Sequence, residues 1–156
     1  MKKTDLAYVA GIFDGEGCVC LRINKGRYYS LDISVANTNE WLMQWLKFAF
    51  GGNFYAMQAK TRKAQNWKPC WRWTITGNKG SSFLKLILPY LRLKKPQAEL
   101  AIKFQEARRG AGYLLTDEER ALEEAQRVIM GKYNKRGTIN KGRHTKEAWQ
   151  TTQKGG

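Results

Sequence analysis

Apolar residues recur at helical spacing near the start of the chain: Leu6, Val9, Ala10 and Phe13. This period predicts an amphipathic helix, with Thr4 as its N-cap. Gly15 and Gly17 follow the last apolar position, and glycines at such a place favour the end of a helix. We therefore expect the first helix to end close to Gly15.

The period then changes to two over residues 18–36. The alternating apolar positions are Val19, Leu21, Ile23, Leu31, Ile33 and Val35. A turn is expected at residues 25–27, between the two runs. Alternation of this kind predicts a β-hairpin with one apolar and one polar face.

The same two patterns repeat farther along the chain. Residues 41–49 have helical spacing and precede Gly51 and Gly52. A second hairpin is predicted from residues 54–60 and 70–76, joined by a basic loop. Its Trp71 and Trp73 should point into the core, because they alternate with Arg72.

Three further helices are predicted. Ser81 or Ser82 begins one of them, and Pro96 suits the first turn of the next, which ends near Arg108. Thr116 and Glu119 form a capping-box pattern for a last helix that ends near Met130. The order α-β-β-α-β-β-α with additional helices predicts an α+β fold, in which helices pack on the apolar face of an antiparallel sheet.

The chain has 156 residues, which suits one compact domain. We place this domain at residues 1–130. Residues 131–156 contain seven Lys or Arg, one Glu and five Gly, and their net charge is +6. This composition predicts an extended or disordered basic arm, which either contacts phosphates or is simply a solvated tail.

The net charge of the whole chain is +15, from 28 Lys and Arg against 13 Asp and Glu. A small basic domain of this kind favours a polyanionic partner, most often nucleic acid. Charge alone does not distinguish DNA from RNA, and a ribosome-bound protein or a merely soluble basic surface would have a similar composition.

Cysteine usage and hydropathy bear on the compartment. Cys18, Cys20 and Cys70 are odd in number and have no zinc-site spacing, which indicates a reducing environment and ordinary thiols. No apolar run approaches the roughly 20 residues of a membrane span, and acidic residues interrupt the apolar stretch after the N-terminal lysines. We expect an intracellular protein, of the cytoplasm or of an organelle, with no membrane partner.

The first predicted helix carries candidate chemistry at its C-terminal end. Gly11 and Gly15 lie four residues apart with Ala10 beside them, so another backbone can approach this strip closely. Two identical chains packed there would form a two-fold dimer, and Glu16 would meet its symmetry mate. Two adjacent carboxylates are most easily accommodated by a cation, and oxygen ligands of this type suit Mg²⁺, with Mn²⁺ or Ca²⁺ able to occupy the same place.

The stretch from Val9 to Gly17 resembles the signature of the LAGLIDADG homing endonuclease family, with valine in place of the first leucine. Residues 37–39, 50–52 and 88–94 add to the similarity, which spans about residues 4–108. The resemblance implies the αββαββα fold with a saddle-shaped antiparallel sheet, and the single motif implies a homodimer. It further implies an intron-encoded, Mg²⁺-dependent nuclease that cuts both strands of a long pseudo-palindromic DNA site and leaves short 3′ overhangs.

The resemblance also implies roles for individual residues. The carbonyl of Gly15 would join Glu16 as a metal ligand, and Asp14 would cap the partner helix at the dimer interface. Lys94 would act near the cleaved phosphate, although it could equally be a phosphate-binding or solvated lysine. Asn37 matches a polar residue near the catalytic water, and its competing role is to cap the following helix.

The polar faces of the two hairpins are the predicted DNA surface, since a β-ribbon fits the major groove. The candidates for contacts to bases are Arg22, Asn24, Tyr28, Ser30, Asp32, Ser34, Arg72 and Thr74. The candidates for contacts to phosphates are Lys25, Arg27, Lys60, Arg62, Lys63 and Lys68. An ordinary sheet with one wet face would have a similar pattern.

Two other functions use the same features. An RNA-splicing maturase would need the same charge and sheet, and RNA would then be the partner. A DNA-binding regulator could keep the fold without catalysis, although the presence of Glu16 and Lys94 argues against this. His144 is the only histidine and lies in the basic arm, which excludes histidine-based nuclease motifs.

Overall fold

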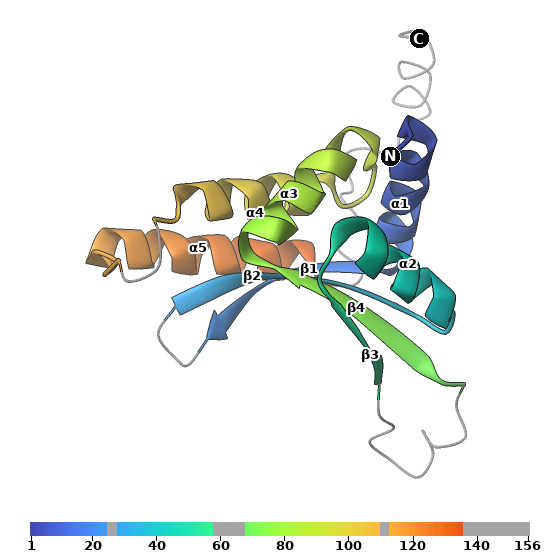
Figure 1. Ribbon diagram of the computed structural model, residues 1–156. Coiled ribbons are helices and arrows are strands. Elements are labelled where there is room, and N and C mark those ends of the chain that lie inside the picture. Colours follow the sequence, from blue (N-terminus) through green and yellow to red (C-terminus); the bar gives the residue numbers. More distant parts are fainter. Residues whose placement is uncertain (25–27, 58–67, 110–112, 136–156) are drawn as a thin grey trace, which may run out of the picture.

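The computed structural model describes residues 1–24, 28–57, 68–109 and 113–135 (Figure 1). The elements in chain order are α1 (Lys3–Glu16), β1 (Gly17–Asn24), β2 (Tyr28–Asn37), α2 (Glu40–Phe50), β3 (Asn53–Met57), β4 (Cys70–Thr76), α3 (Gly77–Ile87), the 3₁₀ turn η2 (Leu88–Tyr90), α4 (Lys95–Ala107) and α5 (Asp117–Tyr133). The predicted α-β-β-α-β-β-α order with additional helices is confirmed.

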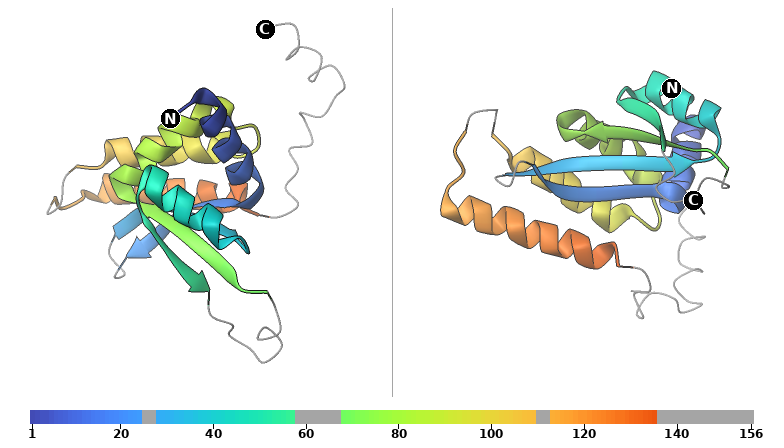
Figure 2. Two further views of the ribbon diagram at one scale, coloured as in Figure 1. Left: turned by 45° about the vertical axis from the view of Figure 1, so that its right-hand side comes forward. Right: turned by 90° about the horizontal axis from the view of Figure 1, so that it is seen from below.

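The strands form one antiparallel sheet in the order β1-β2-β4-β3. Helices cover one face of this sheet, and the view from below in Figure 2 shows the strands of the other face without helices in front of them. Aromatic rings fill the layer between sheet and helices. The ring centroid of Phe83 in α3 lies 5.6 Å from that of Phe13 and 5.1 Å from that of Trp73. Both pairs are arranged edge to face. Trp73 is fully buried, as predicted, and its indole N–H donates to the carbonyl of Gly51 at 2.8 Å.

Helix α5 lies along β1, which is an edge strand of the sheet. The side chain of Asn134, directly after α5, donates to the outward carbonyl of Val19 at 2.7 Å. Tyr29 of β2 donates to Glu124 of α5, and Glu124 also accepts from Arg127 at 2.6 Å. An edge strand exposes unpaired backbone groups, so α5 protects the side of the sheet that would otherwise be open.

Two predicted helix starts were wrong. Helix α1 begins at Lys3, so Thr4 lies inside its first turn, and Asp5 accepts from the backbone amide of Lys2 at 3.0 Å instead. Helix α3 begins at Gly77 rather than at Ser81 or Ser82, because tertiary packing outweighs the poor helix propensity of its first residues. A side chain at Gly80 would lie 3.0 Å from Ile33, so this glycine permits the close approach of α3 to β2.

The last helix follows its predicted start and passes its predicted end. Thr116 and Glu119 form the capping box, with bonds of 3.2 and 2.9 Å. The helix continues to Tyr133, which lies inside the predicted basic arm, and residues 136–156 lie outside the described residues. Within the described part of the chain, no helix has the length and apolarity that crossing a membrane requires.

Candidate functional site

Glu16 is the last residue of α1, and β1 begins at the next residue. Its side chain is exposed. A methyl group on Gly17 would lie 2.4 Å from both the ring and the carbonyl of Phe13, so the junction between helix and strand requires glycine. The absence of a side chain at this residue therefore sets the point at which the chain leaves the helix and the direction of Glu16.

Asp14, two residues before Glu16, bonds to the segment before α4. One carboxylate oxygen accepts from the backbone amide of Arg92 at 2.8 Å, and the other accepts from that of Lys94 at 2.9 Å. Hydrogen bonds to a charged acceptor are stronger than neutral ones. Asp14 thus attaches the end of α1 to the start of α4 within one chain, a contact that was not predicted.

Lys94 completes this attachment with its side chain. Its Nζ donates to the backbone carbonyl of Asp14, one of the last carbonyls of α1, which have no partner inside the helix. Partial burial lowers the pKa of Lys94, and the nearby carboxylates of Asp14 and Glu16 act in the opposite direction. Lys94 therefore lies at the end of α1, with Glu16 among the charges that act on it, and its role in catalysis stays a prediction.

Asn37 lies at the end of β2. Because Gly17 pairs with Val35, Asn37 extends two residues beyond the paired part of β1. Its side-chain oxygen accepts from the backbone amide of Asn39 at 2.9 Å, and Asn39 itself is the N-cap of α2. The alternative that Asn37 caps α2 is wrong, because that position belongs to Asn39; Asn37 instead shapes the turn before the cap.

One strip of α1 is bare. Side-chain carbons added to Gly11 and Gly15 would meet nothing within 4 Å, and both residues are exposed. The predicted inclusion of Ala10 in this strip was wrong, because Ala10 is 0% exposed and packs inside its own chain. Helix periodicity turns Ala10 about 100° from Gly11, toward the core.

Aromatic residues continue this strip onto α2. The ring centroid of Tyr8 in α1 lies 6.1 Å from that of Trp45 in α2. The rings of Trp45 and Trp41 are stacked, with their centroids 6.4 Å apart. Tyr8 is 57% and Trp41 66% exposed. A contiguous exposed aromatic surface of this kind is typical of a protein–protein contact. We call residues Tyr8, Gly11, Gly15, Trp41 and Trp45 the α1–α2 surface.

Metal ligands are few on a single chain. Among the described residues, no group of three or more His, Cys, Asp or Glu is placed to hold an ion. Glu16 offers one exposed carboxylate at the end of the bare strip. A complete coordination shell at this place would need ligands from a second chain or from a bound substrate.

The strand register brings the predicted base-contacting positions to one face of the sheet. Arg22 pairs with Ser30 and Asn24 with Tyr28, while Ser34 pairs with Thr74. Asp32 and Arg72 share this face, because each lies an even number of residues from those positions. Val19, Ile33 and Trp73 alternate with them and are buried under the helices. The uncovered face is therefore the polar face, as predicted.

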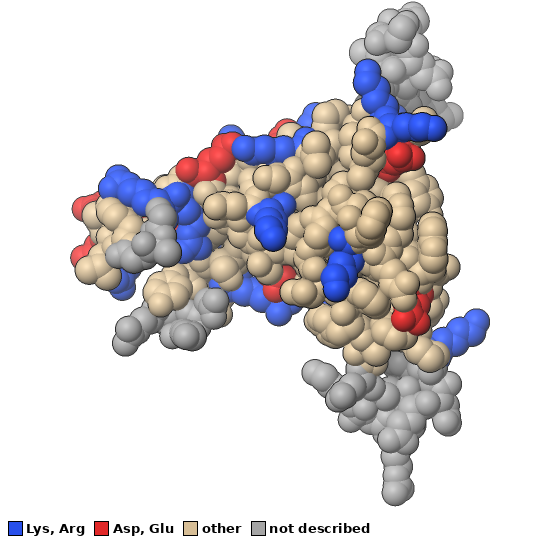
Figure 3. Space-filling view, viewed as in Figure 1, with Lys and Arg blue, Asp and Glu red and all other residues tan. Residues whose placement is uncertain are grey.

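Five of the six residues predicted to contact phosphates lie outside the described residues. They are Lys25, Arg27, Lys60, Arg62 and Lys63. Lys68, two residues before β4, is described and exposed. In the view of Figure 3, Lys and Arg are spread over the molecular surface, with fewer Asp and Glu among them.

Two thiols beside the motif were not predicted to interact. The Sγ atoms of Cys18 and Cys20 lie 3.3 Å apart, because residues two apart on a strand share a face. The hydrogen bond between the two thiols lowers the pKa of Cys18 to about 6, with smaller contributions from Arg22 and Lys94, and the same bond raises the pKa of Cys20. The Cys-x-Cys spacing on a predicted strand was the available signal.

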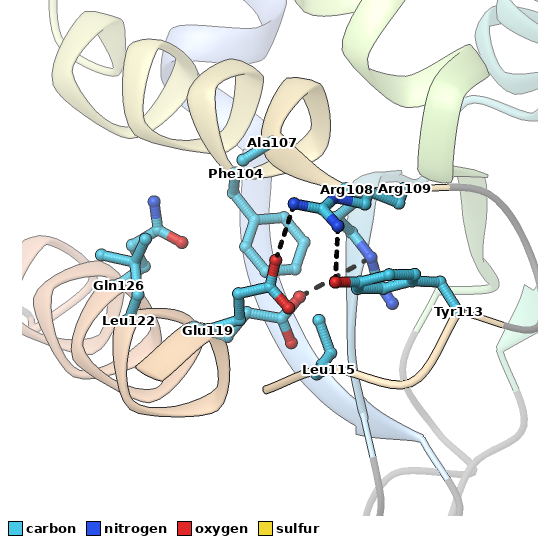
Figure 4. A pocket seen from close by; sticks show the side chains of 10 residues that line it. Phe104, Ala107, Arg108, Arg109, Tyr113, Leu115, Glu119, Leu122 and Gln126 are labelled. Carbon is cyan, nitrogen blue, oxygen red and sulfur yellow. Dashed lines mark hydrogen bonds and ion pairs between the residues drawn. The ribbon is translucent and has the colours of Figure 1, made fainter. Parts of the chain in front are cut away.

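A small cavity lies between the end of α4 and the start of α5 (Figure 4). Arg108 pairs with Glu123 at 3.7 Å and Arg109 with Glu119 at 3.5 Å, so the charged residues of its wall are paired with one another. Arg108 also donates to the backbone carbonyl of Tyr29. These contacts join α4, α5 and β2 and give the cavity a structural role.

Comparisons with known proteins identify the fold. No protein-family model and no curated protein sequence matches the chain. The homing endonuclease I-CvuI in complex with its target matches with a TM-score of 0.62 and 20% identity over 87% of each chain. The archaeal intron-encoded homing endonuclease I-Vdi141I, complexed with DNA, matches with a TM-score of 0.66 and 14% identity over 88% of each chain. A mutant of I-SmaMI matches 95% of this chain and 48% of its own, with a TM-score of 0.50 and 22% identity. The chain therefore has the predicted α+β fold of the LAGLIDADG homing endonucleases.

Proposed function

We propose that this chain is a LAGLIDADG homing endonuclease that acts as a homodimer and hydrolyses both strands of a long pseudo-palindromic DNA site. The observation that carries the proposal is the position of Glu16. Its exposed carboxylate ends α1 beside the bare Gly11–Gly15 strip, with Lys94 next to it. The match to I-CvuI and I-Vdi141I, both homing endonucleases, supports the same function.

The homodimer is proposed because the described residues of one chain do not group three or more metal ligands. A single chain supplies one carboxylate at the end of α1, and a second copy packed on the α1–α2 surface would supply the other. Gly11 and Gly15 would let the two α1 helices approach closely, as small residues do at helix contacts. Tyr8 and Trp41 would bury their exposed rings against the partner, and the partly buried Trp45 would lose its remaining exposure. Aromatic residues contribute most to binding at such contacts.

The residues present fit a divalent metal ion. The carboxylate of Glu16 and the carbonyl of Gly15 are oxygen ligands of the type that Mg²⁺ prefers, and Mn²⁺ or Ca²⁺ could bind them too. Lys94 bonds to the carbonyl of Asp14 and not to that of Gly15. When bound, such an ion makes a water nucleophilic and stabilises the leaving oxygen of a phosphodiester. The products would be duplex ends with short 3′ overhangs, a 5′-phosphate and a 3′-hydroxyl.

The chain's own groups would position the substrate. The ammonium group of Lys94 lies beside Glu16 and can donate to a non-bridging phosphate oxygen, which would stabilise charge in the transition state. Asp14 holds Lys94 in place through the Lys94 backbone amide. A catalytic role for Asn37 would depend on its Nδ2 group, since Oδ1 already accepts from Asn39.

The uncovered polar face of the sheet would bind the major groove on either side of the cut. The side chains of Arg22, Ser30, Ser34, Arg72 and Thr74 would contact base edges. Asp32 lies on the same face and is paired with Arg22, while Asn24 and Tyr28 lie at the end of the first hairpin. Lys68 and the lysines and arginines of the loops would contact phosphates and make binding sensitive to salt.

Cleavage of a randomised duplex library with Mg²⁺ tests this function. The wild type should bind and cut a subset of sequences with two-fold symmetry, and Glu16→Gln should bind the same subset with cleavage reduced by about 1000-fold or more. Glu99→Gln, which removes an exposed carboxylate on α4, should cut normally. Full cleavage by Glu16→Gln would exclude the proposed site. Binding without cleavage by the wild type would indicate a regulator, and selective binding of folded RNA would indicate a maturase.

A further inference from the structure

Arg22 and Asp32 form an ion pair on the uncovered face of the sheet. Arg22 Nε lies 2.9 Å from Asp32 Oδ2. The two residues are diagonal neighbours on β1 and β2, because Arg22 pairs with Ser30 while Asp32 pairs with Cys20. The arginine side chain is 57% exposed and the aspartate side chain only 18%. The acid therefore lies low on the face, and the guanidinium lies above it.

The contact uses one particular donor of the arginine. A guanidinium has five N–H donors, of which Nε carries one. With Nε directed to Asp32, the two terminal nitrogens form the end of the side chain that points away from the contact. Two parallel donors in that arrangement match the O6 and N7 acceptors of guanine in the major groove. The ion pair thus leaves free the edge that a guanine would need.

Neighbouring side chains do not compete for this position. Cys18 and Cys20 on β1, and Ser30 and Ser34 on β2, share the face with Arg22. All four side chains are short, and Tyr28, which shares the face, lies at the end of the hairpin opposite Asn24. The exposed guanidinium of Arg22 is therefore accessible to a base edge that approaches this part of β1 and β2.

Stability does not account for the pair. An exposed ion pair contributes little to stability, because water screens it and ordering a long side chain costs entropy. The same ordering is useful when the arginine must bind, since the rotamer entropy is then lost before the ligand arrives. Arg72, on the same face, has no acidic partner of this kind, and its buried Nε has no hydrogen-bond partner among the described residues.

We propose that Arg22 reads one guanine in each half of the DNA site, and that Asp32 is a positioning residue that orients the guanidinium rather than a base-contacting residue. This inference rests on the proposed function for the identity of the ligand as duplex DNA. In a homodimer, two copies of Arg22 require guanines at two positions related by the two-fold axis, one on each strand.

The experiment selects from a randomised duplex library and sequences the bound and the cut molecules separately. Wild type should show one symmetric pair of guanine positions. Arg22→Ala should lose about 10-fold or more of the preference at that pair, the discrimination typical of one bidentate arginine–guanine contact, and keep the preferences elsewhere. Asp32→Ala should relax the same pair only, and Asp32→Glu should restore part of it. A merely structural role of Asp32 would not confine the change to one base pair of each half-site.

Lys68→Ala is the matched control, because it removes a cation expected to contact phosphate. It should weaken binding of all sequences about equally and leave the base preferences unchanged. An Arg22→Ala profile identical to wild type in the bound molecules would overturn the inference, and so would an Asp32→Ala profile that changes at every position. A guanine pair in the bound molecules with no cut molecules would support the inference and refute the endonuclease.

Discussion

Asp14 holds Lys94 by two hydrogen bonds. Its carboxylate accepts from the Lys94 backbone amide at 2.9 Å, and its own backbone carbonyl accepts from Lys94 Nζ. One acidic residue of the motif therefore sets the position of the only lysine described beside Glu16, 80 residues away in the sequence.

Asp14→Asn should reduce both stability and cleavage. An asparagine side chain has one acceptor oxygen, so one of the amides of Arg92 and Lys94 loses its partner. We expect a loss of about 1–3 kcal/mol in the free energy of unfolding, measured by urea denaturation. Cleavage should fall more than DNA affinity does. Asp5→Asn, at the exposed start of the same helix, should cost less, and an equal loss in both variants would contradict a special role for Asp14.

Gly11→Leu should impair dimerisation and spare the stability of the monomer, whereas Gly17→Ala should reduce stability and have no specific effect on dimerisation. A leucine at Gly11 has free space within its own chain, so the monomer should stay as stable or become slightly more stable, while the side chain would block close packing of two α1 helices. Sedimentation should then give the mass of one chain. An alanine at Gly17 would clash with Phe13, and should destabilise the fold by about 1–3 kcal/mol without a specific effect on association. Normal dimerisation of Gly11→Leu would place the interface elsewhere.

Trp41→Lys should weaken association through α2. The ring is 66% exposed and stacks only on one side, against Trp45, so its loss should affect the monomer little. Buried aromatic residues at interfaces often contribute 2 kcal/mol or more, which predicts a dimer dissociation constant raised by roughly 30-fold. Leu122→Lys on α5, also an exposed apolar residue, serves as the control and should leave the dissociation constant unchanged. Equal effects of the two substitutions would indicate nonspecific contacts.

The docking of α5 should depend on pH through Glu124. Hydrogen bonds from Arg127 and Tyr29 lower the pKa of Glu124 from 4.5 to about 2. A group with a lowered folded-state pKa stabilises the fold above its unfolded pKa, and this contribution disappears as the pH falls through the folded pKa. The difference in Tm between wild type and Glu124→Gln should therefore be full above about pH 5 and shrink between about pH 4.5 and 2. A difference that is constant over this range would show that the charge of Glu124 has no part in the docking.

Local patterns in the sequence were sufficient for the order of the elements and for the motif. Alternation over residues 18–36 identifies a hairpin and its polar face because side-chain direction in a strand depends only on parity. The capping box at Thr116 and the proline at Pro96 are equally local, and both were found in place. Glu16 could be placed at a helix end because glycines flank it on both sides.

Contacts between distant segments were beyond this kind of inference. Periodicity does not say that Asp14 binds amides 78 and 80 residues later, or that Tyr8 meets Trp45 on another helix. It also assigned Ala10 to the wrong side of α1, since adjacent helix residues differ by about 100° and only the packed core shows which direction is inward. The start of α3 was missed because the fit of Gly80 against Ile33 is a tertiary contact that outweighs local propensity.

The chain's own order of residues was thus enough for its elements, the polar face of its hairpins and the acid at the end of α1, because each depends on neighbours within a few positions. The folded arrangement decided which carboxylate positions Lys94, which strip of α1 remains bare, and how Arg22 is paired. These depend on segments that meet only when the sheet and helices pack, and the free energy of that packing is absent from any local pattern.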